Sequence, residues 1–345
     1  GGTPDFASLV EMPTPATSPA DTDSGPFEES DGIAPTADDL PSTAEVASGV
    51  ISQLADLKDE IIINRLSIKR AVAKYGVPAE EAITKEVSQM LDRGVFELVS
   101  RSSLTPEQSG KIIRSSIFLK EKYLPNGDFQ KIKARLVAGG DQQDKSLYSD
   151  TSSPTAALES TMMVIAVAAA EGREVATCDV TGAFLEAEMP DDQEVFMVLE
   201  PAVARVVIKL KPEAKCLLTP NGTMLVRLRR ALYGCVQSSK LWYNKLCSVL
   251  REDGFEMNPY DSCVFNKSVD GVQITVCFHV DDLLMTSKSS ALIDALSAHL
   301  QRSFTEVTFT RGAEHSFLSM TLGCQKNGIS VDMRSYVEKC LTDRK

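Results

Sequence analysis

Two short stretches of this sequence place carboxylates directly beside strand-forming apolar residues. Residues 178–185 contain Asp179, and residues 278–284 contain the pair Asp281 and Asp282. A carboxylate next to a core is costly unless something binds it. Three aspartates brought together would repel one another, and divalent cations would relieve that repulsion. Two-metal phosphoryl transfer needs such a site, so the sequence predicts a metal-dependent nucleotidyl transferase.

The second acidic stretch is typical of a β-hairpin tip. Residues 274–280 are rich in β-branched and aromatic side chains, which favour a strand, and residues 283–286 can return as a second strand. Asp281 and Asp282 then lie at the turn, and Asp179 lies at the end of another strand, at 175–180. Either motif alone is more typical of a solvated turn or a cap. Their order and separation together favour a metal site.

Further blocks of sequence accompany the aspartates. They occupy residues 133–140, 231–237, 241–243 and 279–282. In this order, and over roughly residues 80–340, the blocks resemble the reverse transcriptase of copia-type long-terminal-repeat retrotransposons. The resemblance implies an α+β, right-hand polymerase fold and RNA-directed DNA polymerase activity.

The resemblance assigns the chemistry to particular residues. It implies that Asp179, Asp281 and Asp282 are catalytic and, with the backbone carbonyl of Val180, bind metal. Two Mg²⁺ ions, or Mn²⁺ as a substitute, would activate a primer 3′-oxygen for attack on the α-phosphorus of a dNTP and stabilise the leaving pyrophosphate. The implied partners are an RNA or DNA template, a nucleic-acid primer, and the integrase and RNase H parts of the same polyprotein.

The same resemblance points to the residues that bind the nucleotide. Arg135 is expected to grip the triphosphate, because its fork matches phosphate oxygens, and Lys133 is a weaker candidate of the same kind. Gln237 would contact the sugar, and Lys240 the phosphate or the template. Phe184 would press on the sugar where a 2′-hydroxyl would clash. The alternatives are an exposed strand arginine at 135 and a core phenylalanine at 184.

A few positions depart from the family pattern. His279 stands where the family usually has Tyr, and we interpret it as a positional substitute and not as a metal ligand. Gly139 and Val236 stand where the family usually has Lys, so two positive charges that would contact phosphates are lost. Tyr233 and Trp242 are assigned to packing.

Other functions compete with polymerisation. A decayed or domesticated copy would bind nucleic acid without extending a primer. A palm-fold nucleotidyl cyclase also uses paired carboxylates, but the blocks around Arg135 and Gln237 argue against it.

The charge of −12 is unevenly distributed. Residues 1–60 hold 13 of the 48 acidic groups and one of the 36 basic groups, so the remainder has 35 of each sign. Within that remainder, residues 201–250 hold nine Lys and Arg against one Glu. A local basic excess of this kind attracts phosphate backbones, and part of it is equally typical of a solvated face.

Cysteine spacing and hydropathy indicate the cellular compartment of the protein. The eight cysteines form no Cys-x-x-Cys pair, which argues against zinc and disulfides and indicates a reducing compartment. No secretory signal is visible, and the longest apolar run, at 162–170, is too short to span a bilayer. We expect a cytoplasmic protein without a membrane partner, in the virus-like particle that the resemblance implies.

Composition divides the chain into consecutive regions. Residues 1–50 have too few large apolar side chains to offset ordering entropy and are predicted to be a disordered acidic linker. A helical lead-in is predicted at 51–79, followed by fingers at 80–175, a palm at 176–290 and the start of a thumb at 291–345.

Local patterns predict individual elements. Thr155 is a candidate N-cap, and Gly172 a candidate C-cap, of a helix at 156–170. A hairpin turn is predicted around 327–328. The other predicted elements are helices within 51–75 and at 82–91, 240–251 and 292–300, a strand at 96–99, and a hairpin of strands 112–122 and 129–137.

Overall fold

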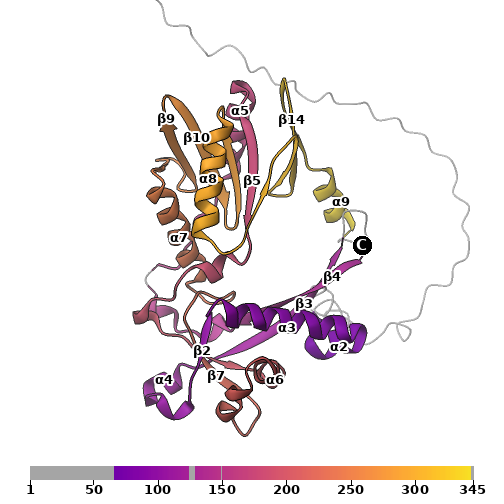
Figure 1. Cartoon of the computed structure of the whole chain (residues 1–345), viewed down its shortest axis with the longest axis vertical. Helices are drawn as coiled ribbons and strands as arrows, with labels where there is room; N and C mark the ends of the chain where they lie inside the picture. Colours follow the sequence, from indigo (N-terminus) through magenta and orange to yellow (C-terminus); the bar gives the residue numbers. More distant parts are fainter. Residues whose placement is uncertain (1–65, 124–128, 149, 343–345) are drawn as a thin grey trace, which may run out of the picture. The chain divides into compact units, whose positions relative to one another are not determined.

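The described chain, which covers residues 66–123, 129–148 and 150–342 of the computed structural model, contains both helices and strands (Figure 1). The predicted linker at 1–50 lies outside these residues. The strands form three sheets. None of the helices in the described ranges is long and apolar enough to cross a membrane.

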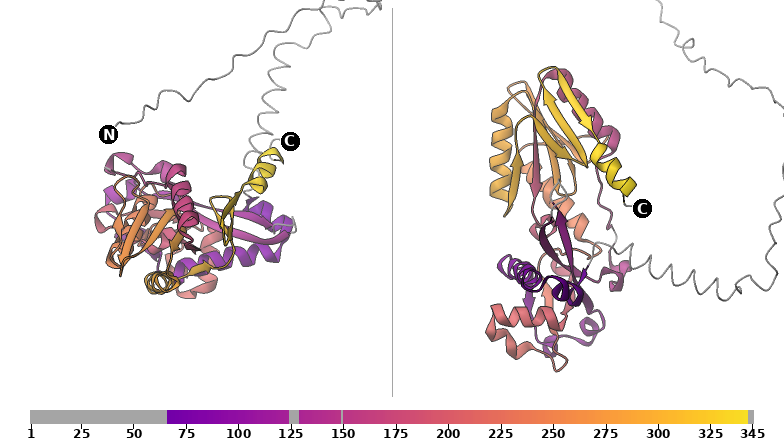
Figure 2. Two further views of the ribbon diagram at one scale, coloured as in Figure 1. Left: turned by 90° about the horizontal axis from the view of Figure 1, so that it is seen from above. Right: turned by 90° about the vertical axis from the view of Figure 1, so that its right-hand side faces the viewer.

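One six-stranded antiparallel sheet, called here the carboxylate sheet, positions the predicted catalytic aspartates. Helix α5 (Leu158–Glu171) lies on one face, and α7 (Ser238–Glu252) and α8 (Ser290–Ser303) lie on the other (Figure 1, Figure 2). The strand order is β12 (Val307–Thr310), β5 (Glu174–Val180), β11 (Asp282–Ser287), β10 (Val272–His279), β9 (Val264–Val269) and β8 (Glu256–Met257).

Strand β10 is buried on both faces. The sulfur of Cys277 lies 3.7 Å from Oγ1 of Thr161 on α5, and the ring of Phe278 lies 6.0 Å from that of Tyr243 on α7. Side chains alternate along a strand, so neighbouring residues meet helices on opposite faces of the sheet. The strands predicted at 274–280 and 283–286 and the helix predicted at 240–251 are confirmed.

A second six-stranded sheet contains the predicted hairpin. Its order is β1 (Leu66–Ser67), β3 (Ile113–Tyr123), β6 (Phe196–Leu199), β7 (Met224–Leu228) and β2 (Phe96–Leu98), with β4 (Phe129–Ala138) paired to β3. The β3–β6 pair is parallel, and the other pairs are antiparallel.

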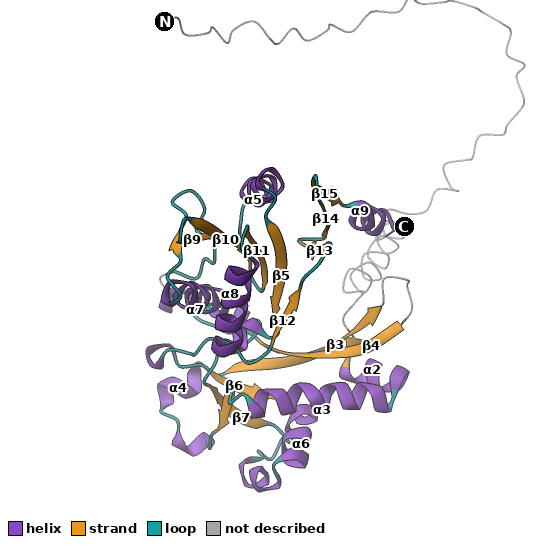
Figure 3. Ribbon diagram, turned by 45° about the horizontal axis from the view of Figure 1, so that its top comes forward, coloured by secondary structure: helices purple, strands orange, loops and turns teal. Residues whose placement is uncertain are grey.

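Helix α3 (Val77–Asp92) runs along the β3–β4 hairpin (Figure 3). The Oε1 atom of Glu86, on α3, accepts a hydrogen bond from the backbone N of Leu136 at 2.9 Å. A backbone donor of β4 is therefore satisfied from the helix rather than from another strand. The helices that complete this half are α2 (Ile68–Tyr75), α4 (Pro106–Gly110) and α6 (Pro201–Leu210).

The last part of the described chain is a three-stranded sheet followed by a helix. Strands β13 (Glu314–Phe317), β14 (Met320–Gln325) and β15 (Gly328–Asp332) are antiparallel neighbours, and α9 (Arg334–Thr342) follows. Gln325 pairs with Gly328, so the turn lies at 326–327 and Gly328 already belongs to the strand. The predicted turn at 327–328 is therefore one residue too late.

Two other local predictions need correction. Helix α5 begins at Leu158, and its cap residue Ala157 makes no side-chain capping bond; the backbone N of Ala157 donates to Oδ2 of Asp261 at 3.0 Å. Thr155 is therefore not the cap, whereas the predicted end at Gly172, with a φ of 63°, is right. Of the helix predicted at 51–75, residues 51–65 lie outside the described residues; residues 66 and 67 form β1 instead of helix, and Ser67 caps α2.

Two hydrophobic cores divide the described chain. The core around the carboxylate sheet draws on residues 156–183 and 242–322. The other draws on residues 71–138 and 185–235. The chain therefore leaves the second core and returns to it, which the consecutive boundaries predicted at 175 and 290 do not anticipate. The assignment of fingers, palm and thumb stays a prediction.

Candidate functional site

Strand pairing brings the predicted catalytic aspartates to one end of the carboxylate sheet. Asp179, at the end of β5, is directly opposite Asp282, the first residue of β11. Directly opposed residues project from the same face of an antiparallel pair. Asp281 lies in the adjoining turn, and its carbonyl O accepts from the backbone N of Val180 at 3.2 Å.

The carboxylates influence one another electrostatically. Burial, followed by repulsion from Asp281 and Asp179, raises the pKa of Asp282 to about 6. Burial also raises the pKa of Asp281, and Asp179 adds to that shift. His279, opposite Asp282 in the β10–β11 register, acts in the other direction on both groups. Its Nδ1 is buried without a hydrogen-bond partner among the described residues.

The turn between β10 and β11 has an unusual backbone. Val280 has a φ of 60°, a conformation that β-branched residues rarely adopt. Its carbonyl O accepts a hydrogen bond from Nε1 of Trp242 at 2.7 Å. Trp242 is buried, as its assignment to packing requires, and it also fixes the turn that carries Asp281.

The aspartates are not arranged as a finished metal cage. In the described ranges, no three His, Cys, Asp or Glu side chains are grouped so that they could hold a metal ion. Oδ2 of Asp179 accepts instead from Oγ1 of Thr181 at 3.4 Å. The carboxylate oxygens are nevertheless the ligands that Mg²⁺ prefers. The metal roles of these aspartates and of Val180 stay predictions.

Lys133 and Arg135 interact electrostatically with Asp179 and Asp281, respectively, and Arg135 and Phe184 both contact the ring of Tyr233. The guanidinium of Arg135, on β4, lies 5.1 Å from the ring centroid of Tyr233, and that ring lies 4.8 Å from the ring of Phe184. Burial and the charge of Arg135 lower the pKa of Lys133, whereas Asp179 opposes that shift. Sequence reasoning assigned Tyr233 to packing alone and missed its place between Arg135 and Phe184.

Two other predicted residues are engaged within the protein. Gln237 is buried; its Oε1 accepts from Nε2 of Gln143 at 3.1 Å, and its Nε2 lies 3.2 Å from Sδ of Met189. The ammonium of Lys240 lies 2.7 Å from Oδ2 of Asp150. Contacts of Gln237 and Lys240 with nucleotide or template stay predictions.

The blocks at 133–140 and 231–237 touch through their backbones. The backbone N of Ala138 donates to the carbonyl O of Tyr233 at 2.8 Å. A Cβ on Gly234 would lie 2.2 Å from the carbonyl O of Ala138, and one on Gly140 would lie 1.9 Å from that of Gly234. These glycines permit the approach that places Tyr233 beside Arg135.

Comparison with known proteins identifies the family to which the chain belongs. A family model described as reverse transcriptase (RNA-dependent DNA polymerase) matches residues 105–345. The chain therefore belongs to the reverse transcriptase family, and the resemblance predicted from its motifs is confirmed.

Similar proteins include retrotransposon polyproteins of plants. The retrovirus-related Pol polyproteins from transposons RE2 and RE1 of Arabidopsis thaliana are 28% and 26% identical over 261 and 257 residues, which is 74% of this chain in both cases. The one from transposon TNT 1-94 of Nicotiana tabacum is 27% identical over 228 residues, or 65% of the chain. The matched region is 16% of each relative, so the chain spans a small part of their length.

Proposed function

We propose that this chain is the reverse transcriptase part of a copia-type Pol polyprotein and extends a primer 3′ end by nucleotidyl transfer from dNTPs. The observation that carries the proposal is the strand register that places Asp179 opposite Asp282, with Asp281 in the adjoining turn. The family match and the named polyprotein relatives support it.

The residues at this end of the sheet have the donor chemistry that a divalent cation prefers, although in the described ranges the side chains are not yet grouped around a metal position. They offer carboxylate oxygens, and the raised pKa of Asp282 and of Asp281 reflects burial and mutual repulsion that a bound cation would relieve. Asp179, Asp281 and Asp282 would hold the ions, with the Val180 carbonyl as a further ligand. Two bound Mg²⁺ ions, or Mn²⁺, supply charge neutralisation at the attacking and leaving oxygens.

The remaining residues would bind and orient the nucleotide. Arg135 and Lys133 lie on β4 and would hold the triphosphate, because Arg135 interacts electrostatically with Asp281 and Lys133 with Asp179. Phe184, supported by Tyr233, would limit the space at the sugar. The same proposal includes the partners and the location. The chain would bind a template and a primer, act beside the integrase and RNase H parts of its polyprotein, and reside in a cytoplasmic particle.

Primer extension on an RNA template with Mg²⁺ tests the proposal. Asp179→Asn and Asp281→Asn should each lower extension by at least about a thousandfold, because an amide cannot balance the charge of a metal. Template–primer affinity should change little, since phosphate contacts lie elsewhere. Near-normal extension by either variant would show that the assignment is wrong.

Two further results would redirect the proposal. If the unmodified chain binds template tightly but extends no primer, it is a decayed or domesticated copy that binds nucleic acid without polymerising. Turnover of nucleotide without a template would identify a cyclase-type reaction.

A further inference from the structure

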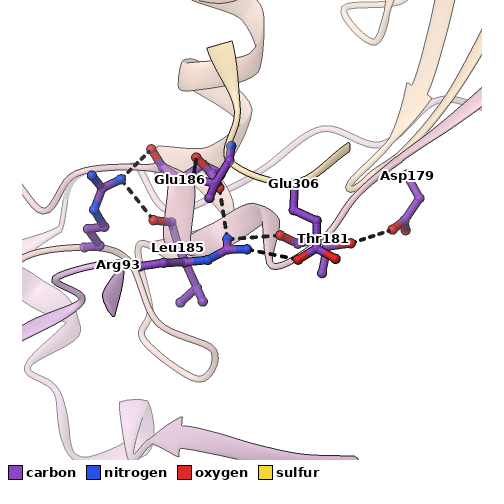
Figure 4. A network of polar contacts seen from close by, with 8 residues as sticks. Arg93, Asp179, Thr181, Leu185, Glu186 and Glu306 are labelled. Carbon is purple, nitrogen blue, oxygen red and sulfur yellow. Dashed lines mark hydrogen bonds and ion pairs between the residues drawn. The ribbon is translucent and has the colours of Figure 1, made fainter. Parts of the chain in front are cut away.

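One arginine, Arg93, contacts both ends of the segment 181–186 that follows Asp179 in the sequence (Figure 4). Nη1 of Arg93, at the end of α3, donates to the carbonyl O of Thr181 at 3.2 Å and to Oε1 of Glu186 at 3.0 Å. Its Nη2 lies 3.4 Å from Oε2 of Glu306. One guanidinium therefore joins both ends of the segment 181–186, which carries Phe184.

The far end of this segment is fixed from a second direction. The carboxylate of Glu186 accepts from the backbone N and from Oγ1 of Thr305, each at 3.2 Å. Nη1 of Arg230 donates to the carbonyl O of Leu185 at 3.2 Å. Elements of both hydrophobic cores thus converge on a short stretch beside the aspartate site.

The pair formed by Arg93 and Glu186 is buried. Their side chains are 9% and 6% exposed. Taking two charges out of water is expensive, so a buried pair contributes little net stability even when its hydrogen bonds are complete. Apolar side chains at these two positions would stabilise the fold at least as well. A buried pair can instead serve to place the segment.

Gly182 allows the guanidinium to approach. Its φ is 69°, and a Cβ at this position would lie 3.2 Å from Nη1 of Arg93. Both the turn after Asp179 and the space for Arg93 therefore require a small residue here.

We propose that Arg93, acting through Thr181 and Glu186, is a positioning residue that sets where Asp179 and Phe184 lie at the reacting nucleotide. Thr181 provides a direct link, because its Oγ1 lies 3.4 Å from Oδ2 of Asp179. A displacement of ~1 Å at a reacting group can cost about a hundredfold in rate. The inference rests on the proposed polymerase function of the aspartate site.

The test compares Arg93 with a second buried arginine, Arg173. Arg93 contacts the segment after β5, whereas Arg173 lies just before β5. Arg173 precedes β5, is 4% exposed at its side chain, and donates to Oγ1 of Thr275 at 3.0 Å and to Glu171 at 3.1 Å. Arg93→Gln and Arg173→Gln each remove one buried guanidinium. Arg93→Lys keeps the charge. The double variant Arg93→Met with Glu186→Leu removes both buried charges, so it does not leave one unpaired.

Hydrogen exchange provides a readout that does not depend on activity. In Arg93→Gln, backbone amides of residues 181–187 should exchange about tenfold faster, while those of β10 keep their protection. Arg173→Gln should leave residues 181–187 unchanged. If Arg93→Gln does not fold, the double variant replaces it in this comparison.

Single-nucleotide extension provides the second readout. Arg93→Gln should lower kcat by about tenfold to a hundredfold and reduce the preference for dNTP over rNTP, with template–primer Kd unchanged. Arg93→Lys should recover part of both losses, and Arg173→Gln should retain the activity and the preference.

The outcomes separate this inference from the function on which it rests. Unchanged exchange at 181–187 in the Arg93 variants would overturn the inference, whatever the activity. A folded double variant with normal kcat and normal sugar preference would overturn it as well. Localised exchange changes in a chain whose unmodified form extends no primer would support the positioning role and contradict the polymerase proposal.

Discussion

At the scale of single residues, the site combines strain with repulsion. Val280 takes a left-handed conformation that costs on the order of 1–3 kcal/mol, and the indole of Trp242 holds its carbonyl in place. Asp282 is half-buried close to other carboxylates, and its pKa is raised to about 6. Both features oppose folding of the isolated chain, and both lie at the β10–β11 turn that carries Asp281 and Asp282.

Replacing Asp282 should therefore stabilise the metal-free protein. Its pKa is about 6 in the folded chain and ~3.9 in an unfolded one, so the favourable contribution below pH ~4 is lost as pH rises through about 6. Asp282→Asn should raise Tm by about 2 °C at pH 7 in EDTA and have less effect at pH 4. It should also reduce any rise in Tm caused by Mg²⁺.

Thermal unfolding with and without Mg²⁺, at both pH values, measures these effects. Glu256→Gln is a suitable control, because Glu256 is exposed on β8 at the far edge of the same sheet. A lower Tm for Asp282→Asn than for the unmodified chain in EDTA at pH 7 would contradict the prediction.

Sugar selection depends on Phe184 and its neighbour. The ring of Phe184 packs against Tyr233 at a centroid distance of 4.8 Å and is half-buried beside the carboxylate-sheet core. Phe184→Val should admit a 2′-hydroxyl and lower the ratio of kcat/KM for dNTP over rNTP by about tenfold to a hundredfold. Incorporation of dNTP should fall less.

Single-nucleotide extension with matched dNTP and rNTP measures this ratio, after a melting curve shows that the variant is folded. Phe309→Val, which removes a partly buried ring of β12 that packs on the same core, controls for loss of packing. An unchanged ratio in a folded, active Phe184→Val variant would assign Phe184 to the core.

At the scale of elements, the sequence was most informative where a local period governs the structure. Alternation along 112–122, 129–137 and 274–280 predicts strands that the structure contains. The aspartate pair could be placed at a turn for the same reason. The start of α5 could not be predicted, because Asp261, about a hundred residues away, holds its first backbone donor.

Contacts between distant elements account for the other gaps. The pairing of Arg93 with Glu186 requires α3 to meet the segment after β5, and no local pattern indicates that meeting. The burial of Gln237 against Gln143 likewise depends on the approach of two loops. Motif resemblance predicts a nucleotide contact for Gln237 but could not predict its partner Gln143.

Glu86 links α3 to β4 and gives a prediction at this scale. Burial raises the pKa of Glu86, although the hydrogen bond from the backbone N of Leu136 acts against that shift. Because the folded pKa is raised, stability is greatest below the unfolded pKa and decreases as pH rises. Glu86→Gln retains an acceptor without the charge and should raise Tm at pH 7 but not at pH 4. Glu86→Ala should lose about 1–3 kcal/mol, because a buried donor is left unsatisfied.

Thermal or urea unfolding at both pH values measures these changes. Glu81→Gln, an exposed position on the same helix, should have no comparable effect. Equal stability of the Gln and Ala variants at pH 7 would show that Glu86 does not serve Leu136.

At the scale of the whole molecule, part of the basic excess at 201–250 is paired with acidic side chains. Arg227 and Arg229 pair with acidic neighbours of the second sheet, Glu97 among them. Lys240 pairs with Asp150. Part of the excess therefore balances local charge. Lys133 and Arg135 of β4 interact electrostatically with Asp179 and Asp281, so we propose that they attract phosphates to the site.

The acidic N-terminal region should oppose that attraction. Residues 1–48 contain ten Asp and Glu and no Lys or Arg, so their removal takes away ten negative charges that repel a phosphate backbone. A chain that begins at residue 49 should bind template–primer as tightly as the full chain or up to about tenfold more tightly at low salt. The difference should shrink as added salt shortens the Debye length to ~8 Å at physiological ionic strength.

Fluorescence anisotropy across a salt series measures both effects, and equal melting temperatures would show that both chains contain the same folded part. Weaker binding by the shorter chain at low salt would mean that the acidic region assists binding instead of opposing it.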